Sequence, residues 1–349
     1  MIQAKNEYDV SVIICTYNRW ELLSHALKHL CAQDTCNVRY EIVVVDNNST
    51  DETRKIVESF IARHKVSIRY VFENKQGLSH ARNAGIKNAL APLLAFTDDD
   101  VEVAPDWIKS VKESFDKHPE VDFVGGKVLP NWPEEPPAWL TSRSHWAPVA
   151  LTDYGDASFY SNAENPVCLI GANIGIRRSA FNLVGMYEPK FQRMKGNIGA
   201  EDHEWLLRLW QAGGQGIYVP TVIVKADVPV ERMKKAFHRI WHTGHGYACG
   251  LMQLNELIDD KGELRQQPIK ARQFLGASAF LYRDLLASIA GWFKSMLRGN
   301  KSRAFAEENQ VRYLISYIRN SRQYNLQNRY LRPTKTVSSP GVLRARRRQ

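Results

Sequence analysis

Short apolar runs alternate with segments that repeat apolar residues at helical spacing through the first third of the chain. The apolar runs are rich in β-branched residues and end at polar positions, which is typical of buried strands. They cover residues 10–15, 40–45, 68–72 and 93–97. Strands and helices that alternate with short links predict an α/β fold, with a largely parallel sheet covered by helices on both faces.

Helices are expected between these strands and after the last of them. They are predicted at residues 20–32, after a cap at Ser49 or Thr50, at 77–90 and at 104–118. Ser and Thr both favour the N-terminal cap of a helix, and acidic residues in the first turn suit the helix dipole. The first 118 residues therefore read as repeated strand–helix units.

This pattern changes after residue 127. Residues 128–168 are dense in Pro and Trp and show no period, which predicts a long loop or flap. Strand-like and helical segments then return at 168–178, 179–187, 199–214, 217–228 and 230–250.

Charge is distributed unevenly along the chain. The net charge is +10, yet residues 265–349 hold 18 Lys and Arg against 3 Asp and Glu, so the preceding residues are net acidic. A basic segment suits an anionic partner. Nucleic acid is not expected, because no recognition motif accompanies the basic segment. Five cysteines without zinc-type spacing favour a reducing compartment, and no signal peptide or spanning helix is predicted.

Three consecutive aspartates, Asp98, Asp99 and Asp100, directly follow a predicted buried strand. Mg²⁺ and Mn²⁺ prefer carboxylate oxygen and are often held by one or two carboxylates together with diphosphate oxygens. The alternative is an acidic turn before the next helix. Ligands of parallel sheets bind beyond the carboxyl ends of the strands, so the triplet, Asp46 and Tyr17 are expected in one crevice. This placement favours a metal–nucleotide site.

Four stretches of the chain together resemble the family 2 glycosyltransferases, which have the GT-A fold. They are SVIICTYNR, EIVVVDNNSTDET, GLSHARNAGI and LLAFTDDDVEVAPDWI, and GAEDHEWLLRL matches the family's later acidic motif. The resemblance covers about residues 8–225, without reliable coverage of 128–168. It implies an inverting, metal-assisted transfer from a nucleotide-diphosphate sugar to a glycan or lipid-linked acceptor, with Mn²⁺ or Mg²⁺ as the cofactor.

The resemblance also implies roles for particular residues. Asp202 would be the catalytic base, with Glu201 as its rival, and Asp100 would hold the metal. The nucleotide-sugar site would be formed by Thr16, Tyr17, Asn18, Arg19, Asp46, Arg82, Asp98 and Asp99. Within that site, Asp46 would contact the nucleobase, and Arg82 would lie near it. A base that deprotonates the acceptor hydroxyl and a carboxylate that binds the metal must come from separate elements, and Asp202 and Asp100 satisfy this.

Two further groups of residues are candidates for the site. His238 and His242 have a spacing that metal ligands on a helix can use, and His242, His245 and Arg239 are candidates for a group near the diphosphate. His242 is also a candidate metal ligand, and incidental surface histidines are the alternative. Trp132, Trp139 and Trp146 either stack on the acceptor sugar or form a hydrophobic lid cluster.

Three glycines accompany the segments that follow residue 168. Gly171 and Gly175 either let the backbone approach the donor sugar or relieve crowding in a strand, and Gly199 could let the chain turn into the acidic helix. We expect mainly structural roles for all three.

Residues 274–297 and 303–320 predict two amphipathic helices. The first carries Phe274, Leu281, Leu285, Ile289, Phe293 and Met296 near helical spacing, flanked by basic residues. These helices either lie at an anionic membrane surface or pack back on the catalytic domain. A peripheral position on the inner face of the plasma membrane, in the cytoplasm, is therefore the expected location.

These expectations divide the chain into three parts. A GT-A catalytic domain is predicted at residues 1–228, with a nucleotide-binding half at 1–127 and an acceptor half at 128–228. A helical extension follows at 229–328 and a basic disordered tail at 329–349. A sugar nucleotidyltransferase and a non-catalytic scaffold that binds nucleotide sugar at the membrane are the competing hypotheses.

Overall fold

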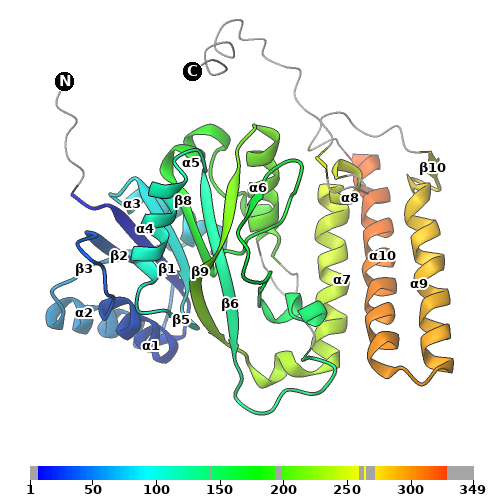
Figure 1. The fold of residues 1–349 in the computed structure, drawn as a ribbon, viewed down its shortest axis with the longest axis horizontal. Coiled ribbons are helices and arrows are strands. Elements are labelled where there is room, and N and C mark those ends of the chain that lie inside the picture. The colour runs from blue at the N-terminus through cyan, green and yellow to red at the C-terminus, as the bar shows by residue number, and fades with distance from the viewer. Residues whose placement is uncertain (1–6, 142, 193–198, 259–262, 265–271, 328–349) are drawn as a thin grey trace, which may run out of the picture.

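The computed structural model describes residues 7–141, 143–192, 199–258, 263–264 and 272–327. Helices flank a central sheet, and three long helices stand side by side next to it (Figure 1). The predicted tail at 329–349 lies outside the described residues.

The first half of the sheet consists of four parallel strands. They are β1 (Val10–Thr16), β2 (Tyr40–Asp46), β3 (Ser67–Phe72) and β4 (Leu93–Asp98), in the order β3-β2-β1-β4. Both faces are buried, since Val12 and Ile14 belong to one core cluster and Ile13 to the other. These strands confirm the sequence prediction, and their carboxyl ends meet at one edge of the sheet.

Helices cover both faces of the sheet. One core cluster contains buried residues of α1 (Trp20–Cys31), α2 (Thr53–Arg63) and α4 (Trp107–Lys117), and the other those of α3 (Leu78–Asn88), α5 (Arg178–Val184) and α6 (Glu201–Gln211). The cap predicted at Ser49 or Thr50 is wrong, because α2 begins after Glu52. Asp51 instead accepts hydrogen bonds from Thr53, while Ser49 and Thr50 bind Asn18.

The second half of the sheet is mixed. It contains β5 (Val101–Val103), β6 (Phe123–Asn131), β7 (Phe159–Ser161), β8 (Asn173–Arg177) and β9 (Gly216–Asp227). The order continues β4-β8-β6-β9-β5, and β7 also pairs with β9. The largely parallel sheet that was predicted is found in β1 to β4 and in the pair β6–β9, whereas β8 runs antiparallel to β4 and β6, and β5 and β7 run antiparallel to β9. The segment predicted as a loop at 128–168 also holds β7 and the end of β6, which are too short there to show a period.

Several short elements connect these strands and helices. They are η1 (Arg143–His145), η2 (Ala147–Val149), η3 (Pro189–Phe191), η4 (Val230–Met233), α8 (Leu254–Leu257), β10 (Gln273–Phe274) and β11 (Ala277–Ser278). The 3-10 turns η2 and η4 matter most here, since residues of both line the cavity described below.

The C-terminal helices pack on one another and on the rest of the chain. Helix α10 (Lys301–Gln327) lies between α7 (Lys235–Met252) and α9 (Ala279–Leu297). Their shared core includes Phe191 and Ala200, which precede α6. The helical extension therefore packs in part on the segments that precede α6. In α9, Leu281 is buried whereas Phe293 and Met296 are exposed, so the predicted apolar face is divided between packing and solvent.

Candidate functional site

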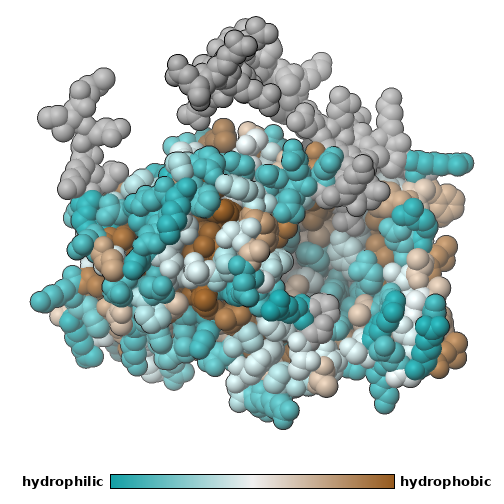
Figure 2. All heavy atoms as spheres, viewed as in Figure 1, coloured by the Kyte–Doolittle hydropathy of each residue, from teal (hydrophilic) through white to brown (hydrophobic). Residues whose placement is uncertain are grey.

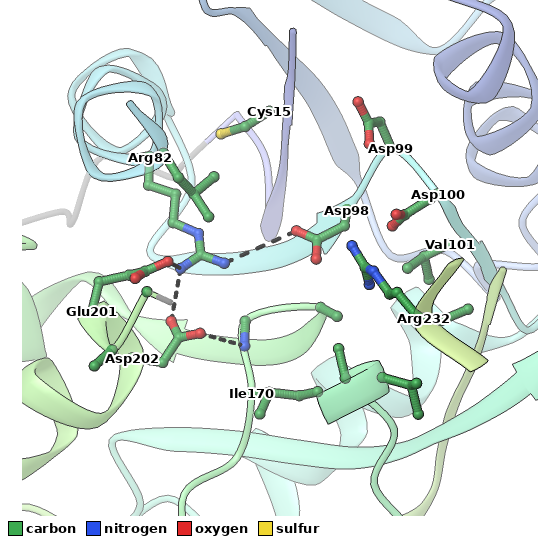
Figure 3. A pocket seen from close by; sticks show the side chains of 18 of the residues that line it. Cys15, Arg82, Asp98, Asp99, Asp100, Val101, Ile170, Glu201, Asp202 and Arg232 are labelled. Atoms are coloured by element: carbon green, nitrogen blue, oxygen red, sulfur yellow. Dashed lines mark hydrogen bonds and ion pairs between the residues drawn. The ribbon is translucent and has the colours of Figure 1, made fainter. Parts of the chain in front are cut away.

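A cavity of about 850 Å³ opens where β1 and β4 end. Its walls come from these strand ends, α3, η2, the start of α6 and the region of η4 and α7. Asp98, Asp99 and Asp100 line it together with Glu201 and Asp202, which are far away in the sequence (Figure 3). The fold thus joins the two acidic motifs in one site.

Asp99 anchors the acidic triplet to β1. The Thr16 hydroxyl donates a hydrogen bond to Asp99 Oδ2 at 2.7 Å, and an Arg19 guanidinium nitrogen donates to Asp99 Oδ1 at 3.1 Å. The same nitrogen lies 3.3 Å from Asp100 Oδ2. Burial raises the pKa of Asp99 to about 6. The middle aspartate is therefore a buried support, whereas the side chains of Asp98 and Asp100 are more accessible from the cavity.

The cavity carries an excess of negative charge. Its described lining residues include six carboxylates and three guanidinium groups, from Asp98, Asp99, Asp100, Glu201, Asp202, Asp227, Arg19, Arg82 and Arg232. Burial, and then the neighbouring Asp100 and Asp99, raise the pKa of Asp98, although Arg82 opposes this. Hard divalent cations prefer a set of carboxylate oxygens such as Asp98 and Asp100 provide. The residues present thus fit Mn²⁺ or Mg²⁺.

Arg82 joins the acidic residues of α6 to those of β4. It donates to Asp202 Oδ1 at 2.8 Å, and the same nitrogen lies 3.6 Å from Glu201 Oε1. Its other terminal nitrogen lies 4.0 Å from Asp98 Oδ1. Burial disfavours the charged guanidinium, but the surrounding carboxylates outweigh it and raise the pKa of Arg82. Arg82 was expected near the nucleobase. It is instead the buried counter-ion of Asp202, the predicted general base.

Asp202 is held by a second donor. The backbone N–H of Gly171 donates to Asp202 Oδ2 at 3.1 Å. A Cβ at Gly171 would overlap the Arg82 guanidinium and lie 3.0 Å from Asp202 Oδ1, so only glycine leaves room for this network. A mainly structural role was expected for Gly171, and in addition its backbone holds the carboxylate of Asp202.

Glu201 and Asp202 differ in their access to the cavity. The Asp202 side chain is 21% exposed and that of Glu201 is 7%. Glu201 Oε2 is buried with no hydrogen-bond partner among the described residues. Burial, and then the charge of Asp202, raise the pKa of Glu201 to about 7. Asp202 is thus the carboxylate better placed to meet a substrate.

Two residues predicted for the nucleotide site lie outside the described cavity lining. Asn18 Oδ1 accepts a hydrogen bond from the Thr50 N–H at 2.7 Å. Asp46 is buried and accepts from the Tyr70 hydroxyl at 2.7 Å and from the Ser49 N–H. Both side chains brace loops at the strand ends. Tyr17 and Arg19 line the cavity as expected, and so does Asn47, which sequence reasoning missed.

Helix α7 and the turn before it supply a further wall of the site, and the sequence had offered only His245 of its lining residues as a candidate. Arg232, Phe237, Ile240, Trp241 and His245 line the cavity from this side. Figure 3 shows Arg232 pointing toward Asp98 and Asp100. No motif marks Arg232 in the sequence, because its place depends on the path of the chain after β9.

The other basic candidates of this region have different contacts. His238 Nε2 donates to the Arg232 carbonyl at 3.0 Å, which fixes the turn that carries Arg232. Arg239, expected near the diphosphate, forms an ion pair with Glu308 of α10 at 2.7 Å. His242 does not belong to the described cavity lining, in contrast to its predicted metal role.

The three tryptophans of the flap do not line the described cavity either. The Trp139 ring lies 4.7 Å from that of His238 and 5.0 Å from that of Phe305, measured between centroids. Trp132 and Trp146 pack against the core. Their arrangement corresponds to the hydrophobic cluster that was the alternative interpretation, and it fixes the flap to α7 and α10.

Solved structures share this architecture, which is that of the GT-A glycosyltransferases. A mannosyltransferase from Pyrobaculum calidifontis, solved with GDP-Man and Mn²⁺, matches with a TM-score of 0.58 at 18% identity, over 91% of this chain and 88% of that one. TarS from S. aureus, solved with UDP, matches with a TM-score of 0.51 at 16% identity, over 92% and 93%. At such low identity these matches establish the fold.

The sequence establishes the family. The family model described as glycosyl transferase family 2 matches residues 11–185, half of the chain, so the protein belongs to that family. A glucosyl-dolichyl phosphate glucuronosyltransferase of Haloferax volcanii is 28% identical over 60% of this chain and 65% of its own length. A validoxylamine A glucosyltransferase of Streptomyces hygroscopicus subsp. jinggangensis is 35% identical over 45% and 38%. The matches therefore span less than two thirds of these relatives.

Proposed function

We propose that the protein is an inverting glycosyltransferase that moves a sugar from a nucleotide-diphosphate sugar to an acceptor hydroxyl. One observation carries the proposal: the acidic triplet and Asp202 line one cavity but come from separate elements. Such a site can hold the diphosphate at one end and a general base at the other. The family membership and the ligands named for the solved relatives agree with this assignment.

The general base of the proposed reaction is Asp202. Arg82 and Gly171 each bind one of its oxygens, which fixes the carboxylate before substrate arrives. Each carboxylate oxygen retains a further lone pair, so Asp202 can accept the proton of an acceptor hydroxyl as that oxygen attacks the anomeric carbon. Attack from the side opposite the leaving diphosphate inverts the configuration at that carbon.

The leaving diphosphate is assigned to the triplet end of the cavity. Asp98 and Asp100 would hold a divalent cation there, which neutralises charge on the diphosphate when bound. Arg232, which points toward the same carboxylates, would contribute a fixed positive charge. Arg19 would exchange its contact with Asp100 for contacts to the diphosphate of the donor.

The acceptor is assigned to the wall formed by α7. Phe237, Ile240 and Trp241 give this part of the cavity an apolar and aromatic surface, and Ile240 is exposed. Aromatic faces stack well on sugar rings, and apolar side chains suit a lipid carrier. A glycan or lipid-linked acceptor fits this wall.

A peripheral membrane position is part of the proposal. Leu286, Phe293 and Leu297 of α9 are exposed and recur at helical spacing, with Lys294 and Arg298 exposed beside them. Figure 2 shows hydrophobic residues along the edge of the molecule where α9 lies. An exposed apolar stripe with basic neighbours suits an anionic bilayer surface. Among the described helices, none is both long and apolar enough to cross a membrane.

A ligand panel tests the catalytic proposal. Nucleoside diphosphates and nucleotide sugars are compared by thermal shift with and without Mn²⁺, and release of free sugar or transfer is then measured for the donor that binds. We expect Mn²⁺-dependent stabilisation and slow donor hydrolysis. Binding without turnover would support a scaffold, and turnover of a nucleoside triphosphate with a sugar phosphate would support a nucleotidyltransferase.

Flotation with vesicles tests the membrane proposal. Phe293→Ser together with Leu286→Ser should abolish co-flotation with anionic vesicles, while Leu183→Ser, an exposed residue of α5, serves as the control. Equal flotation of both variants would contradict the assignment to α9.

A further inference from the structure

A second cluster of metal-ligand side chains lies outside the cavity, between α1 and β5. His25 and His29 are one turn apart on α1, and Glu102 belongs to β5. The ligand atoms of the three residues all lie within 4.8 Å of one another, and His25 Nδ1 is 3.8 Å from Glu102 Oε1. The two imidazole centroids are 5.0 Å apart. Within the described part of the chain, no other three His, Cys, Asp or Glu residues are grouped this closely.

We propose that His25, His29 and Glu102 bind a divalent transition-metal ion of the zinc class. Two imidazoles and one carboxylate, with water at the remaining position, are a ligand set that Zn²⁺ and Co²⁺ accept. Histidines four residues apart on a helix lie on one face and can bind one ion together. The side chains are accessible, because His25 is exposed and the other two are half-buried.

The carboxylate of this cluster is available for a metal. The only recorded ion-pair contact of Glu102 within the described residues is with His25, and no lysine or arginine there lies within ion-pair distance of it. A single cation bound by the Glu102 carboxylate and both imidazoles would stabilise all three side chains in this arrangement. Metal binding would draw the three ligand atoms around one ion, each at a metal–ligand distance of about 2.0–2.2 Å.

The site differs in chemistry from the acidic triplet. Asp98 and Asp100 offer only oxygen and suit Mg²⁺ or Mn²⁺, whereas imidazole nitrogen selects zinc-class ions. The two sites are nevertheless linked through the chain. Arg19, just before α1, contacts Asp99 and Asp100, and Glu102 follows that triplet by two residues. A metal at the histidine cluster would add a second tie between α1 and the strand that leaves the triplet.

Cobalt titration of the full chain in excess Mg²⁺ tests the proposal, because Mg²⁺ occupies oxygen sites and Co²⁺ bound to nitrogen absorbs visible light. We expect one Co²⁺ per chain, displaced by one equivalent of Zn²⁺, and a rise in Tm that saturates at that stoichiometry. His25→Gln and Glu102→Gln should each weaken binding by about tenfold or more. His64→Gln, an exposed histidine beyond the end of α2, is the matched control and should bind like the wild type.

The experiment separates this site from the proposed active site. Asp100→Asn should retain the Co²⁺ signal while it loses Mn²⁺-dependent nucleotide binding. His25→Gln should lose the Co²⁺ signal while it retains Mn²⁺-dependent nucleotide binding. Identical isotherms for His25→Gln and His64→Gln would overturn the proposal. So would absence of stoichiometric binding, or loss of the cobalt signal in Asp100→Asn.

Discussion

Arginines contact the carboxylates at both acidic ends of the cavity, but their surroundings differ greatly. At the strand end, Arg19 contacts Asp99 and Asp100 with a side chain that is 44% exposed. At the α6 end, Arg82 contacts Asp202 and Glu201 with a side chain that is 5% exposed. An exposed ion pair is weak and easily exchanged for another partner, whereas removal of one member of a buried pair leaves an uncompensated charge.

This difference matches the roles proposed for the two ends. At the end that would receive a cation and a diphosphate, the counter-ion is Arg19, which a ligand can replace. The end that would hold the general base is fixed by Arg82 and Gly171 before any ligand arrives, which lowers the reorganisation needed during reaction. The four predictions that follow test this contrast.

The largest effect is expected on turnover when the base is removed. Asp202→Asn keeps the shape of the side chain but cannot accept the proton, so turnover should fall by about 10³-fold with nucleotide binding retained. Asp100→Asn should instead weaken Mn²⁺-dependent nucleotide binding. Initial rates and calorimetric nucleotide titrations of both variants decide the matter, and unchanged turnover in Asp202→Asn would remove Asp202 from the mechanism.

The same substitution at Arg82 and at Arg19 should distinguish the contribution of a buried arginine to stability from that of an exposed one. Arg82→Met leaves buried carboxylates uncompensated and should reduce the free energy of unfolding by about 3–5 kcal/mol. Arg19→Met should reduce it by less than about 1 kcal/mol, because the Arg19 side chain is 44% exposed and water can take its place beside Asp99 and Asp100. Urea denaturation at neutral pH measures both, and similar losses in the two variants would contradict the comparison.

A single methyl group tests how closely the Arg82–Asp202 arrangement must be kept. Gly171→Ala places a Cβ in the space of the Arg82 guanidinium, so the carboxylate should shift and turnover should fall by about 10²-fold. Gly291→Ala in α9 is the control, since its Cβ would meet only the end of the Glu307 side chain. Wild-type rates in Gly171→Ala would show that the base tolerates displacement.

The smallest effect is a change in the pH dependence of stability. Because the pKa of Glu201 is raised to about 7 in the folded chain, the native state binds more protons than the unfolded state from about pH 4.5 to 7. Ionisation of Glu201 therefore destabilises the fold as the pH rises through this range. The Tm of Glu201→Gln, relative to wild type, should be higher at pH 8 than at pH 5, and a constant difference would refute the raised pKa.

Local patterns were sufficient for the first half of the fold. Strands β1 to β4 each form a continuous apolar run, and the helices between them repeat apolar residues at helical spacing, so their signals lie within a few neighbouring positions. The ends of parallel strands share one edge, which is why the sequence alone places Tyr17 and Asp98 to Asp100 in one crevice, and all four line the cavity. The short strands β5 and β7 carry too few residues to show a period.

The sequence by itself determined the family, the strand–helix units and the acidic residues that reach the strand ends. Only the tertiary structure decided which side chains come together: Arg82 pairs with Asp202, Asp46 accepts a hydrogen bond from Tyr70, and Arg232 points toward Asp98 and Asp100. Secondary structure follows from neighbours in the chain, whereas ion pairing depends on distances between residues far apart in it. Those distances are set by how the sheet, α6 and α7 pack, and no local pattern encodes them.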